Sequence, residues 1–421
     1  MKFIADFHIH SKYSRATSKD MDIDHIVDWA QIKGIDLMGT GDFTHHLWLE
    51  ELKSKLEPKD NGIFVYRTKD NALLNKKEIH FILTAEISSI YSKKGKTYRI
   101  HNIIFAPSFA VVDKINAVLS RLGNLASDGR PILGLDAAEL AKIVFDIDES
   151  CMLVPGHIWT PWFSLFGSMS GFDRISDCFE AQTPKIFALE TGLSSDPAMN
   201  WRLSALDKFS LVSNSDSHSP SKIGREANIF DCELSYKAIR NTLKTKDKNK
   251  FLLTIEFFPE EGKYHFDGHR ACGVRLAPRE TRQNKGRCPK CGRPVTIGVM
   301  NRVEELADRP EGTIPDNAIP FKNLIPLDEI IAEAKGVGKS SLSVGREYRS
   351  LVGRFENEFE ILLNVPDKDL LSSIPERIAQ GIIKVRQGKV NINPGFDGEY
   401  GIISIFEQGQ TENKQAQLDL F

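Results

Sequence analysis

Two pairs of potential metal ligands have a single residue between their members: His8 with His10, and Asp216 with His218. Side chains two positions apart on a strand point to the same face, so each pair can reach one metal ion. One such pair alone is weak evidence, because a packed or surface histidine pair is more common. Two pairs that each end an apolar run are harder to explain by packing. They are accompanied by further ligand-type residues: Glu86, His101 and His157.

This mixture of imidazoles and carboxylates predicts a particular chemistry. It suits zinc, manganese or iron better than calcium, which prefers oxygen ligands alone. The number of candidates predicts more than one metal ion. Neighbouring metals can lower the pKa of a bridging water and clamp a phosphoryl oxygen, so we expect hydrolysis of a phosphoester.

The elements that must position these residues alternate along the first half of the chain. Residues 2–10 and 35–40 form apolar runs typical of buried strands, and residues 24–33 between them have a helical pattern that Gly34 ends. Repeated strands and helices predict an α/β fold with parallel βαβ units, and their number favours a barrel. The candidate ligands follow the ends of the strands. A barrel builds its active site there, so we expect one site.

A second cluster of metal ligands lies in the second half. Cys288 and Cys291 form a CxxC pair, and His269 and Cys272 precede them with the same spacing; His265 is an alternative to His269. Three cysteines and a histidine leave no open coordination position, so we expect a structural zinc site. A redox CxxC is the competing interpretation, but it would require a strand before it and a helix after it.

The surroundings of this cluster are basic, although the chain of 421 residues has a net charge of -2. Residues 237–300 contain 15 Lys and Arg against 6 Asp and Glu, which indicates contact with a polyanion. A solvated lysine-rich linker would also explain part of this charge. The arginines expected to contact DNA phosphates are Arg270, Arg275, Arg279 and Arg282.

The chain contains no apolar run of the roughly 18 residues that a membrane span needs, and no signal peptide. We therefore expect a cytoplasmic protein without a membrane partner. In that reducing compartment the cysteines are expected to bind metal or pack in the core rather than form disulfides.

Helical patterns return after residue 300, and the segment Gly336–Ser341 resembles a P-loop. A P-loop would need glycine where Glu333 stands, and a strand rather than a helix before it. We therefore expect no nucleotide cofactor and predict a helix–turn–helix. The exposed amides near Gly336 and Gly338, together with Lys339, could hold a DNA phosphate. A plain interhelical turn is an equally good interpretation.

Four motifs of the first half, HIHS, GTGDFTH, PGH and SDSH, resemble those of the polymerase and histidinol phosphatase (PHP) family. This resemblance implies a distorted TIM-like (β/α)7 barrel with two or three divalent metals, zinc or else manganese or magnesium. It also implies that Glu86 bridges the metals. The ligands it implies are His8, His10, Glu86, His101, His157, Asp216 and His218, with Asp42 or His45 as a further one.

Two features depart from the PHP pattern. Asp42 and His45 are separated by two residues where the family often has an adjacent Asp-His pair, so the choice between them stays open. Arg15 occupies the stretch where many members have an acidic ligand. One ligand is then missing or comes from elsewhere, and Arg15 is a candidate for holding a phosphate.

The order of motifs over nearly the whole chain resembles the endonuclease Q family: the PHP motifs, then HRACGVRL and CPKCGRPVTIGV, then REYRSLVGRF and FEILL. That resemblance implies a DNA repair endonuclease that cuts 5′ of uracil, hypoxanthine and abasic sites, with Asp216, Glu86 and His218 as catalytic residues. Reaching a base within a duplex would require flipping it out. The domains expected are a barrel (1–250), a zinc module (251–300), a helical DNA-binding region (301–407) and a flexible tail (408–421).

The chain ends in QLDLF after a polar stretch without a hydrophobic core to join. This pentapeptide is similar to the motif by which bacterial repair and replication proteins dock on the sliding clamp. The residues expected to bind the clamp are Gln417, Leu418, Leu420 and Phe421. A tail that packs on the helical region, or is merely frayed, is the alternative.

Two other functions compete with a DNA endonuclease. A PHP phosphatase acting on a small phosphoester would not need a basic zinc module or a helical region. A DNA-binding adaptor with an inert barrel would not need so nearly complete a set of metal ligands.

Overall fold

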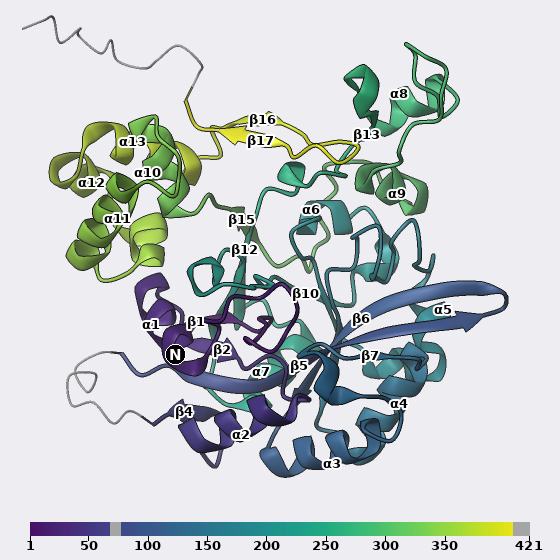
Figure 1. The fold of residues 1–421 in the computed structure, drawn as a ribbon. Helices are drawn as coiled ribbons and strands as arrows, with labels where there is room; N and C mark the ends of the chain where they lie inside the picture. Colours follow the sequence, from purple (N-terminus) through teal and green to yellow (C-terminus); the bar gives the residue numbers. More distant parts are fainter. Residues whose placement is uncertain (68–76, 407–421) are drawn as a thin grey trace, which may run out of the picture.

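A large mixed sheet organises the computed structural model, which describes residues 1–67 and 77–406 (Figure 1). Its strands run in the order β15-β12-β11-β1-β2-β5-β4-β3, and β6, β7 and β8 are attached through β5 and β6. The strands are β1 (Lys2–Asp6), β2 (Leu37–Gly39), β3 (Leu56–Pro58), β4 (Phe64–Tyr66), β5 (His80–Lys93), β6 (Lys96–Ala106), β7 (Ile132–Leu133), β8 (Met152–Pro155), β11 (Ala227–Asp231), β12 (Phe251–Glu256) and β15 (Phe321–Asn323).

The pairing of these strands differs from the parallel βαβ units expected from the sequence. β1 pairs with β2, and β2 with β5, in parallel, but β1–β11, β11–β12, β5–β6 and β6–β8 are antiparallel. β9 (Ala188–Glu190) and β10 (Ser210–Val212) form a separate parallel pair. Across the described ranges the hydrogen-bonded ladders do not close into a barrel, so the closed barrel is not confirmed. The sheet also extends past residue 250, where we expected the first domain to end.

The longest ladder is the hairpin of β5 and β6, which projects as two long blue ribbons in Figure 1. Its turn consists of Lys94 and Gly95, with φ angles of 50° and 79°. Two successive left-handed residues make the turn whose twist matches that of the flanking strands. The hairpin places Glu86 opposite Ile103 and Ser88 opposite His101, so one ladder carries two of the predicted ligands.

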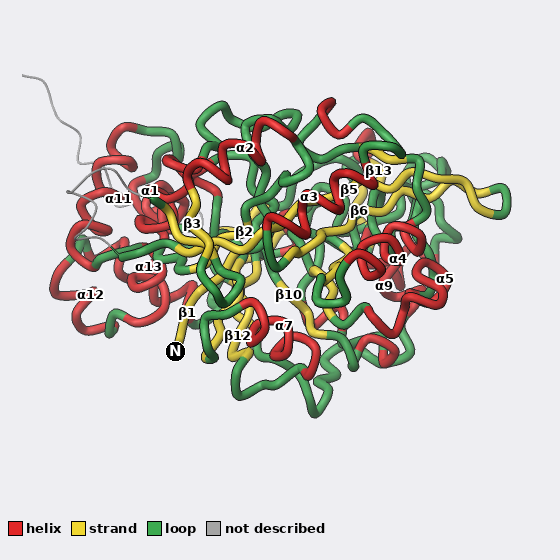
Figure 2. The backbone as a smooth tube through the Cα atoms, turned by 90° about the horizontal axis from the view of Figure 1, so that it is seen from below, coloured by secondary structure: helices red, strands yellow, loops and turns green. Residues whose placement is uncertain are grey.

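Helices cover the outside of this sheet, as Figure 2 shows for α2, α3, α4 and α7. α1 illustrates how the sequence sets their ends. The Asp22 side chain accepts a hydrogen bond from the amide of His25 at the start, and Gly34 adopts a φ of 85° at the end. The helices are α1 (Ile23–Lys33), α2 (His46–Lys55), α3 (Phe109–Leu119), α4 (Ala137–Ile147), α5 (Ile175–Phe179), α6 (Pro197–Asn200) and α7 (Tyr236–Thr245).

A small module with little apolar core follows the sheet, at the upper right of Figure 1. Its own buried apolar cluster consists of Val274, Leu276, Cys288 and Val295. The C-terminal hairpin of β16 and β17 lies across it, because Gly268 and Phe396 meet and Asp397 accepts hydrogen bonds from Arg270 and Thr296. The elements are β13 (Asp267–His269), β14 (Val274–Leu276), α8 (Pro278–Gln283), α9 (Val299–Leu306), β16 (Asn391–Asn393) and β17 (Ile402–Ser404).

The C-terminal helices gather at one end of the molecule beside α1 (Figures 1 and 2). They are α10 (Leu327–Lys335), α11 (Leu342–Phe355), α12 (Asp367–Ser373) and α13 (Glu376–Arg386), with a short π-helix at Glu360–Asn364. None of the helices in the described ranges combines the length and the hydropathy that a membrane span requires.

A buried ion pair joins these helices to α1. The Lys33 ammonium lies 2.6 Å from the Glu358 carboxylate. The same carboxylate accepts hydrogen bonds from the Tyr348 hydroxyl (2.5 Å) and the Leu327 amide (3.0 Å). Both charged side chains are almost fully buried, so each depends on the other for compensation.

Replacing Lys33 by Met should therefore destabilise the protein by about 3–5 kcal/mol, because Glu358 would keep a buried charge without a cation. Lys142→Met is the matched control, since Lys142 pairs with Asp146 on the exposed face of α4 and both are more than half exposed. That change should leave the stability nearly unchanged, because solvent screens an exposed pair. Chemical denaturation followed by circular dichroism measures both. Equal denaturation midpoints for the two variants would show that the buried pair of Lys33 and Glu358 contributes no more to stability than the exposed pair does.

Candidate metal centre

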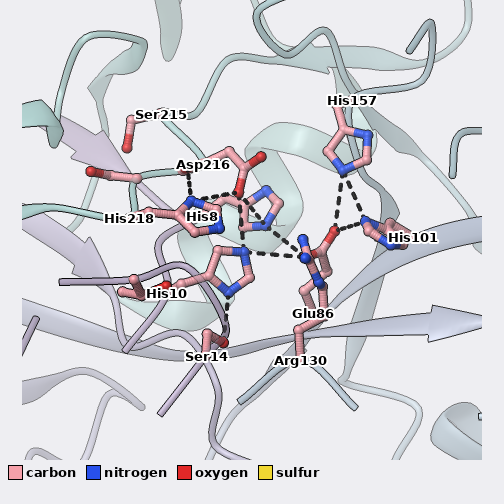
Figure 3. A network of polar contacts seen from close by, with 12 residues as sticks. His8, His10, Ser14, Glu86, His101, Arg130, His157, Ser215, Asp216 and His218 are labelled. Carbon is pink, nitrogen blue, oxygen red and sulfur yellow. Dashed lines mark hydrogen bonds and ion pairs between the residues drawn. The ribbon is translucent and has the colours of Figure 1, made fainter. Parts of the chain in front are cut away.

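Two groups of ligand-type side chains meet at one carboxylate. His8, His10, Glu86 and Asp216 form the first group, and Glu86, His101 and His157 form the second (Figure 3). Within each group the ligand atoms lie within 4.8 Å of one another. Glu86 Oε2 faces the first group, 3.2 Å from His10 Nε2, while its Oε1 lies 2.6 Å from His101 Nδ1. Glu86 is therefore placed to bridge two metal ions.

The first pair of ligands follows β1 directly. Ile9 forms a bridge with Ser217, and the amide of His10 donates to the carbonyl of Ser217. The extended backbone points both histidines to one side, as their spacing predicted. Asp216 precedes Ser217 on the neighbouring segment and has a φ of 46°. A non-glycine residue in the left-handed region is uncommon, and such strain concentrates at functional sites.

Among the described residues, three of the four ligand atoms of the first group lack hydrogen-bond partners, and the fourth, Glu86 Oε2, accepts from Arg130. Within the described part of the chain, the three without a partner are His8 Nε2, His10 Nε2 and Asp216 Oδ1, all of which are buried. Asp216 Oδ1 lies 3.1 Å from His10 Nε2 and 3.7 Å from His8 Nε2. Buried polar atoms are normally satisfied, so three that converge in this way fit a bound cation. Two imidazoles and two carboxylates suit a divalent transition metal.

The charges of the ligand groups depend on one another. Burial raises the pKa of Glu86, but the cationic groups around it outweigh burial and hold that pKa well below its usual range. Burial lowers the pKa of His101 to about 4. For His8 and His10 the neighbouring carboxylates outweigh burial and raise the pKa well above its usual value. Without a cation these two imidazoles therefore keep their protons, and a bound metal would displace them.

A second layer of carboxylates fixes the histidines. Glu190 lies 3.0 Å from His8 Nδ1, and Asp42 lies 3.0 Å from His10 Nδ1. Each contact leaves the Nε2 atom of that ring facing the metal position, which is the usual arrangement behind a metal-bound histidine. Glu190 also accepts a hydrogen bond from the amide of His157 (2.7 Å), so it positions a residue of each group.

The structure bears on the choice left open between Asp42 and His45. Asp42 lies behind His10, and its other oxygen accepts hydrogen bonds from Ser11 and Ser14. His45 stacks on Tyr13 at 4.5 Å between ring centroids. In the described residues neither joins a ligand group, and Asp42 is placed to orient His10.

Two other predicted site residues also lie outside the groups. The ring of His218 stands 4.5 Å from that of His10, but its Nδ1 faces the carbonyl of Asp216 at 2.9 Å. Arg15 is 79% exposed and pairs with Asp128 at 3.3 Å. It is thus on the surface, where it can meet a phosphate.

The predicted zinc ligands come together in the small module. The ligand atoms of His269, Cys272, Cys288 and Cys291 lie within 4.8 Å of one another, and Cys291 Sγ is 3.6 Å from His269 Nδ1. His265, the alternative ligand, is buried elsewhere and lines a pocket. Four closely spaced donors with three thiols form a closed Cys3His site.

Nearly the whole chain is similar to two solved structures of known proteins. The structure is similar over 97% of the chain to the lesion-specific endonuclease PfuEndoQ from Pyrococcus furiosus, with a TM-score of 0.84, 32% identity and 96% of that chain covered. It is equally similar to Endonuclease Q in complex with a 27-mer duplex substrate with an abasic lesion at the active site, with a TM-score of 0.82, 32% identity and 97% of both chains covered. The chain belongs to the endonuclease Q family.

Sequence relatives agree with this membership. The uncharacterized protein YqxK of Bacillus subtilis is 30% identical over 415 residues, which cover 96% of this chain and 99% of the relative. The uncharacterized protein MJ0043 of Methanocaldococcus jannaschii is 35% identical over 274 residues, or 62% of this chain. The match spans only 33% of that longer relative. The family model for the MJ0043 C-terminal domain matches residues 326–389, which comprise the helices α10 to α13.

The basic residues predicted to bind DNA in this endonuclease Q relative lie on the module and the helices. Arg270, Arg275, Arg279 and Arg282 are exposed, although Arg275 donates to Asn393 and Arg282 to Glu304. Gly336 ends α10 with a φ of 64°, and α11 begins at Leu342, so a short turn joins the two helices as predicted.

A pocket of about 660 Å³ lies between the sheet, the zinc module and the C-terminal helices. Its lining includes Phe257, Tyr264, Tyr400, Lys263 and Arg225. Arg225 also donates two hydrogen bonds to the carbonyl of Ser215, next to Asp216. One residue of the pocket lining thus contacts the segment that carries Asp216, and the pocket offers aromatic faces and cations in one place.

Two functional residues were missed by the sequence analysis. Glu190 ends a short strand, as other candidate ligands do, so the same rule would have found it. Arg130 donates a hydrogen bond to Glu86 at 3.1 Å. It lies in a loop without a motif, and nothing in the sequence pattern singles it out.

We predict that Cys288→Ser removes one zinc ion per chain and weakens binding of duplex DNA, because so small a core cannot hold the module without metal. Elemental analysis and fluorescence anisotropy measure the two effects. Cys232→Ser, at a thiol outside both ligand sets, is the control and should keep all the zinc. Unchanged zinc content in Cys288→Ser would rule out the Cys3His site.

Proposed function

We propose that this chain is a metal-dependent DNA repair endonuclease, which hydrolyses the phosphodiester 5′ of uracil, hypoxanthine and abasic sites. The observation that carries the proposal is the pair of ligand groups sharing Glu86, in a chain that matches a lesion-specific endonuclease over 97% of its length. The lesions themselves are inferred from the family resemblance.

In this proposal the first metal is held by His8, His10, Asp216 and Glu86, and the second by Glu86, His101 and His157. Bound divalent metals would supply Lewis acidity and lower the pKa of a water molecule. Glu190 and Asp42 keep the imidazoles of His8 and His10 in the tautomer that leaves Nε2 free. Zinc, manganese and magnesium are the candidate metals, and a third ion would need ligands beyond these two groups.

DNA binding is proposed to use the zinc module and the helical region together. Exposed arginines of the module would contact backbone phosphates, and this contact makes binding weaken as salt is added. The pocket lined by Arg225 and Tyr264 supports extrusion of the damaged nucleotide. Its rings can stack on a base and its cations can face a phosphate, which is how single nucleotides are commonly held.

Asp216→Asn should fold normally and cut damaged duplexes more than about a hundredfold more slowly, because it removes a charged metal ligand. The assay compares duplexes containing uracil, hypoxanthine or an abasic site with an undamaged duplex of the same sequence. Asp146→Asn on the exposed face of α4 is the control and should cut at the wild-type rate.

Two outcomes would overturn the function. If Asp216→Asn cut as fast as the wild-type protein, the metal centre would not be the active site. If the wild-type protein hydrolysed a small phosphoester such as p-nitrophenyl phosphate but none of the duplexes, the small-molecule phosphatase would be the better assignment.

We further propose that Gln417, Leu418, Leu420 and Phe421 dock on a replication sliding clamp; these residues lie outside the described part of the chain. The motif QLDLF supports this, since two large apolar side chains at the end can fill a pocket of a partner. A short peptide ligand loses conformational entropy on binding, so the dissociation constant should be on the order of micromolar.

Removing residues 417–421 should abolish binding to the clamp and leave cleavage of short duplexes unchanged. Surface plasmon resonance with immobilised clamp measures the first effect, and a gel assay measures the second. Full binding by the truncated chain, or no binding by the intact chain, would dismiss this role.

A further inference from the structure

Arg130 places a permanent positive charge at the edge of the metal centre. Its Nη1 lies 3.1 Å from Glu86 Oε2, the same oxygen that is 3.2 Å from His10 Nε2 (Figure 3). A guanidinium cannot be deprotonated in a protein. Arg130 therefore stays charged whether or not metals are bound. It contacts Glu86, the carboxylate that both ligand groups share.

The position of this arginine is fixed by its loop. Its amide donates to the Asp128 carboxylate at 3.1 Å, and the carbonyl of Pro131 accepts from Ser88 on β5 at 3.0 Å. The preceding residue, Gly129, packs so tightly that a Cβ atom there would lie 2.2 Å from Asp42 Oδ2. The loop thus rests directly on the layer that orients His10.

The charges around Arg130 leave one anion to be supplied. Two divalent cations and a guanidinium would carry five positive charges against four carboxylates: Glu86 and Asp216 among the ligands, and Glu190 and Asp42 behind the histidines. Placing like charges together in a partly buried site is unfavourable unless a further anion lies between them. A phosphodiester supplies that charge, and a guanidinium suits it because its fork of N–H groups matches phosphate oxygens.

Arg130 also has the donors and the access for this contact. Of its five N–H groups, one is given to Glu86 among the described residues. Its side chain is 27% exposed, whereas Glu86 is fully buried, so the guanidinium is the member of this pair that a substrate can reach. Asp128, which accepts from the Arg130 amide, also binds Arg15 at 3.3 Å and sets a second, exposed arginine near the first.

We propose that Arg130 is a catalytic residue that donates hydrogen bonds to a non-bridging oxygen of the scissile phosphodiester, while Arg15 contacts a neighbouring phosphate. This inference rests on the proposed function, since it takes a DNA backbone as the substrate. A plain positioning role, in which Arg130 only holds Glu86, is the alternative that the experiment must separate.

The test uses the full-length, metal-loaded protein and the variants Arg130→Ala and Arg130→Lys. Removing one donor to a developing oxyanion slows chemistry by about 10²–10³-fold, so the single-turnover rate at saturating DNA should fall by that factor in Arg130→Ala. Arg130→Lys keeps the positive charge but loses the paired N–H donors of the guanidinium. Its single-turnover rate should therefore lie between those of the wild-type protein and Arg130→Ala. Arg121→Ala, at an exposed arginine outside the ligand groups, should keep the wild-type rate.

Two measurements besides activity distinguish catalysis from positioning. Metal content should be the same in Arg130→Ala and in the wild-type protein, whereas the affinity for inorganic phosphate, measured by calorimetry, should fall at least about tenfold. Sulfur in place of one non-bridging oxygen should slow the wild-type protein with one diastereomer, and this effect should shrink in Arg130→Ala.

The possible results distinguish a failure of the proposed endonuclease function from a failure of the role proposed for Arg130. A wild-type protein that cuts no damaged duplex refutes the proposed function. A wild-type protein that cuts, with Arg130→Ala equally fast or equally affected by sulfur, refutes the role of Arg130. Loss of metal in both Arg130 variants would assign it to positioning Glu86 and overturn the inference.

Discussion

The carboxylate of Glu86 is the interaction on which the rest of the metal centre depends. It is buried in the middle of β5, where an isolated charge would cost several kcal/mol. Four histidines and Arg130 lie within 3.4 Å of its two oxygens. These cationic or proton-bearing groups come from widely separated parts of the chain. The folding of the sheet is therefore coupled to the assembly of the site, because only the assembled site compensates Glu86.

The sequence predicts those parts of the site that obey a short-range rule. His8 and His10 share a face because strand side chains alternate, and the structure places both at the metal position. The same rule applied to Asp216 and His218 places only Asp216 within a ligand group of the described residues. Asp216 has a φ of 46°, which interrupts the alternation and turns His218 toward the carbonyl of Asp216 instead. A single left-handed residue cannot be read from spacing.

Pairing over long distances is the part that spacing does not reveal. Spacing alone does not show that β5 and β6, which carry Glu86 and His101, form one antiparallel hairpin. The turn residues Lys94 and Gly95 held a signal for it, since glycine at a turn favours a hairpin. Asp42 was a candidate ligand because of its motif, but its role depends on Ser11 and Ser14, which fold back onto it. Glu190 and Arg130 likewise act through partners far away in sequence.

The position of α1 links the metal centre to the helices expected to bind DNA. On one side, Gly34 at the end of α1 leads into β2, which pairs with β1 just before His8. On the other side, Lys33 is buried against Glu358, and a Cβ atom on Gly34 would lie 2.2 Å from Asn357 Oδ1. The Asn357 side chain packs so closely on the Gly34 backbone that the two segments have little room to slide without breaking the ion pair. The strand that carries the first ligands and the C-terminal helices are thus held by one junction. A duplex gripped by those helices would therefore be presented to Glu86 and Arg130 in a register that this junction sets.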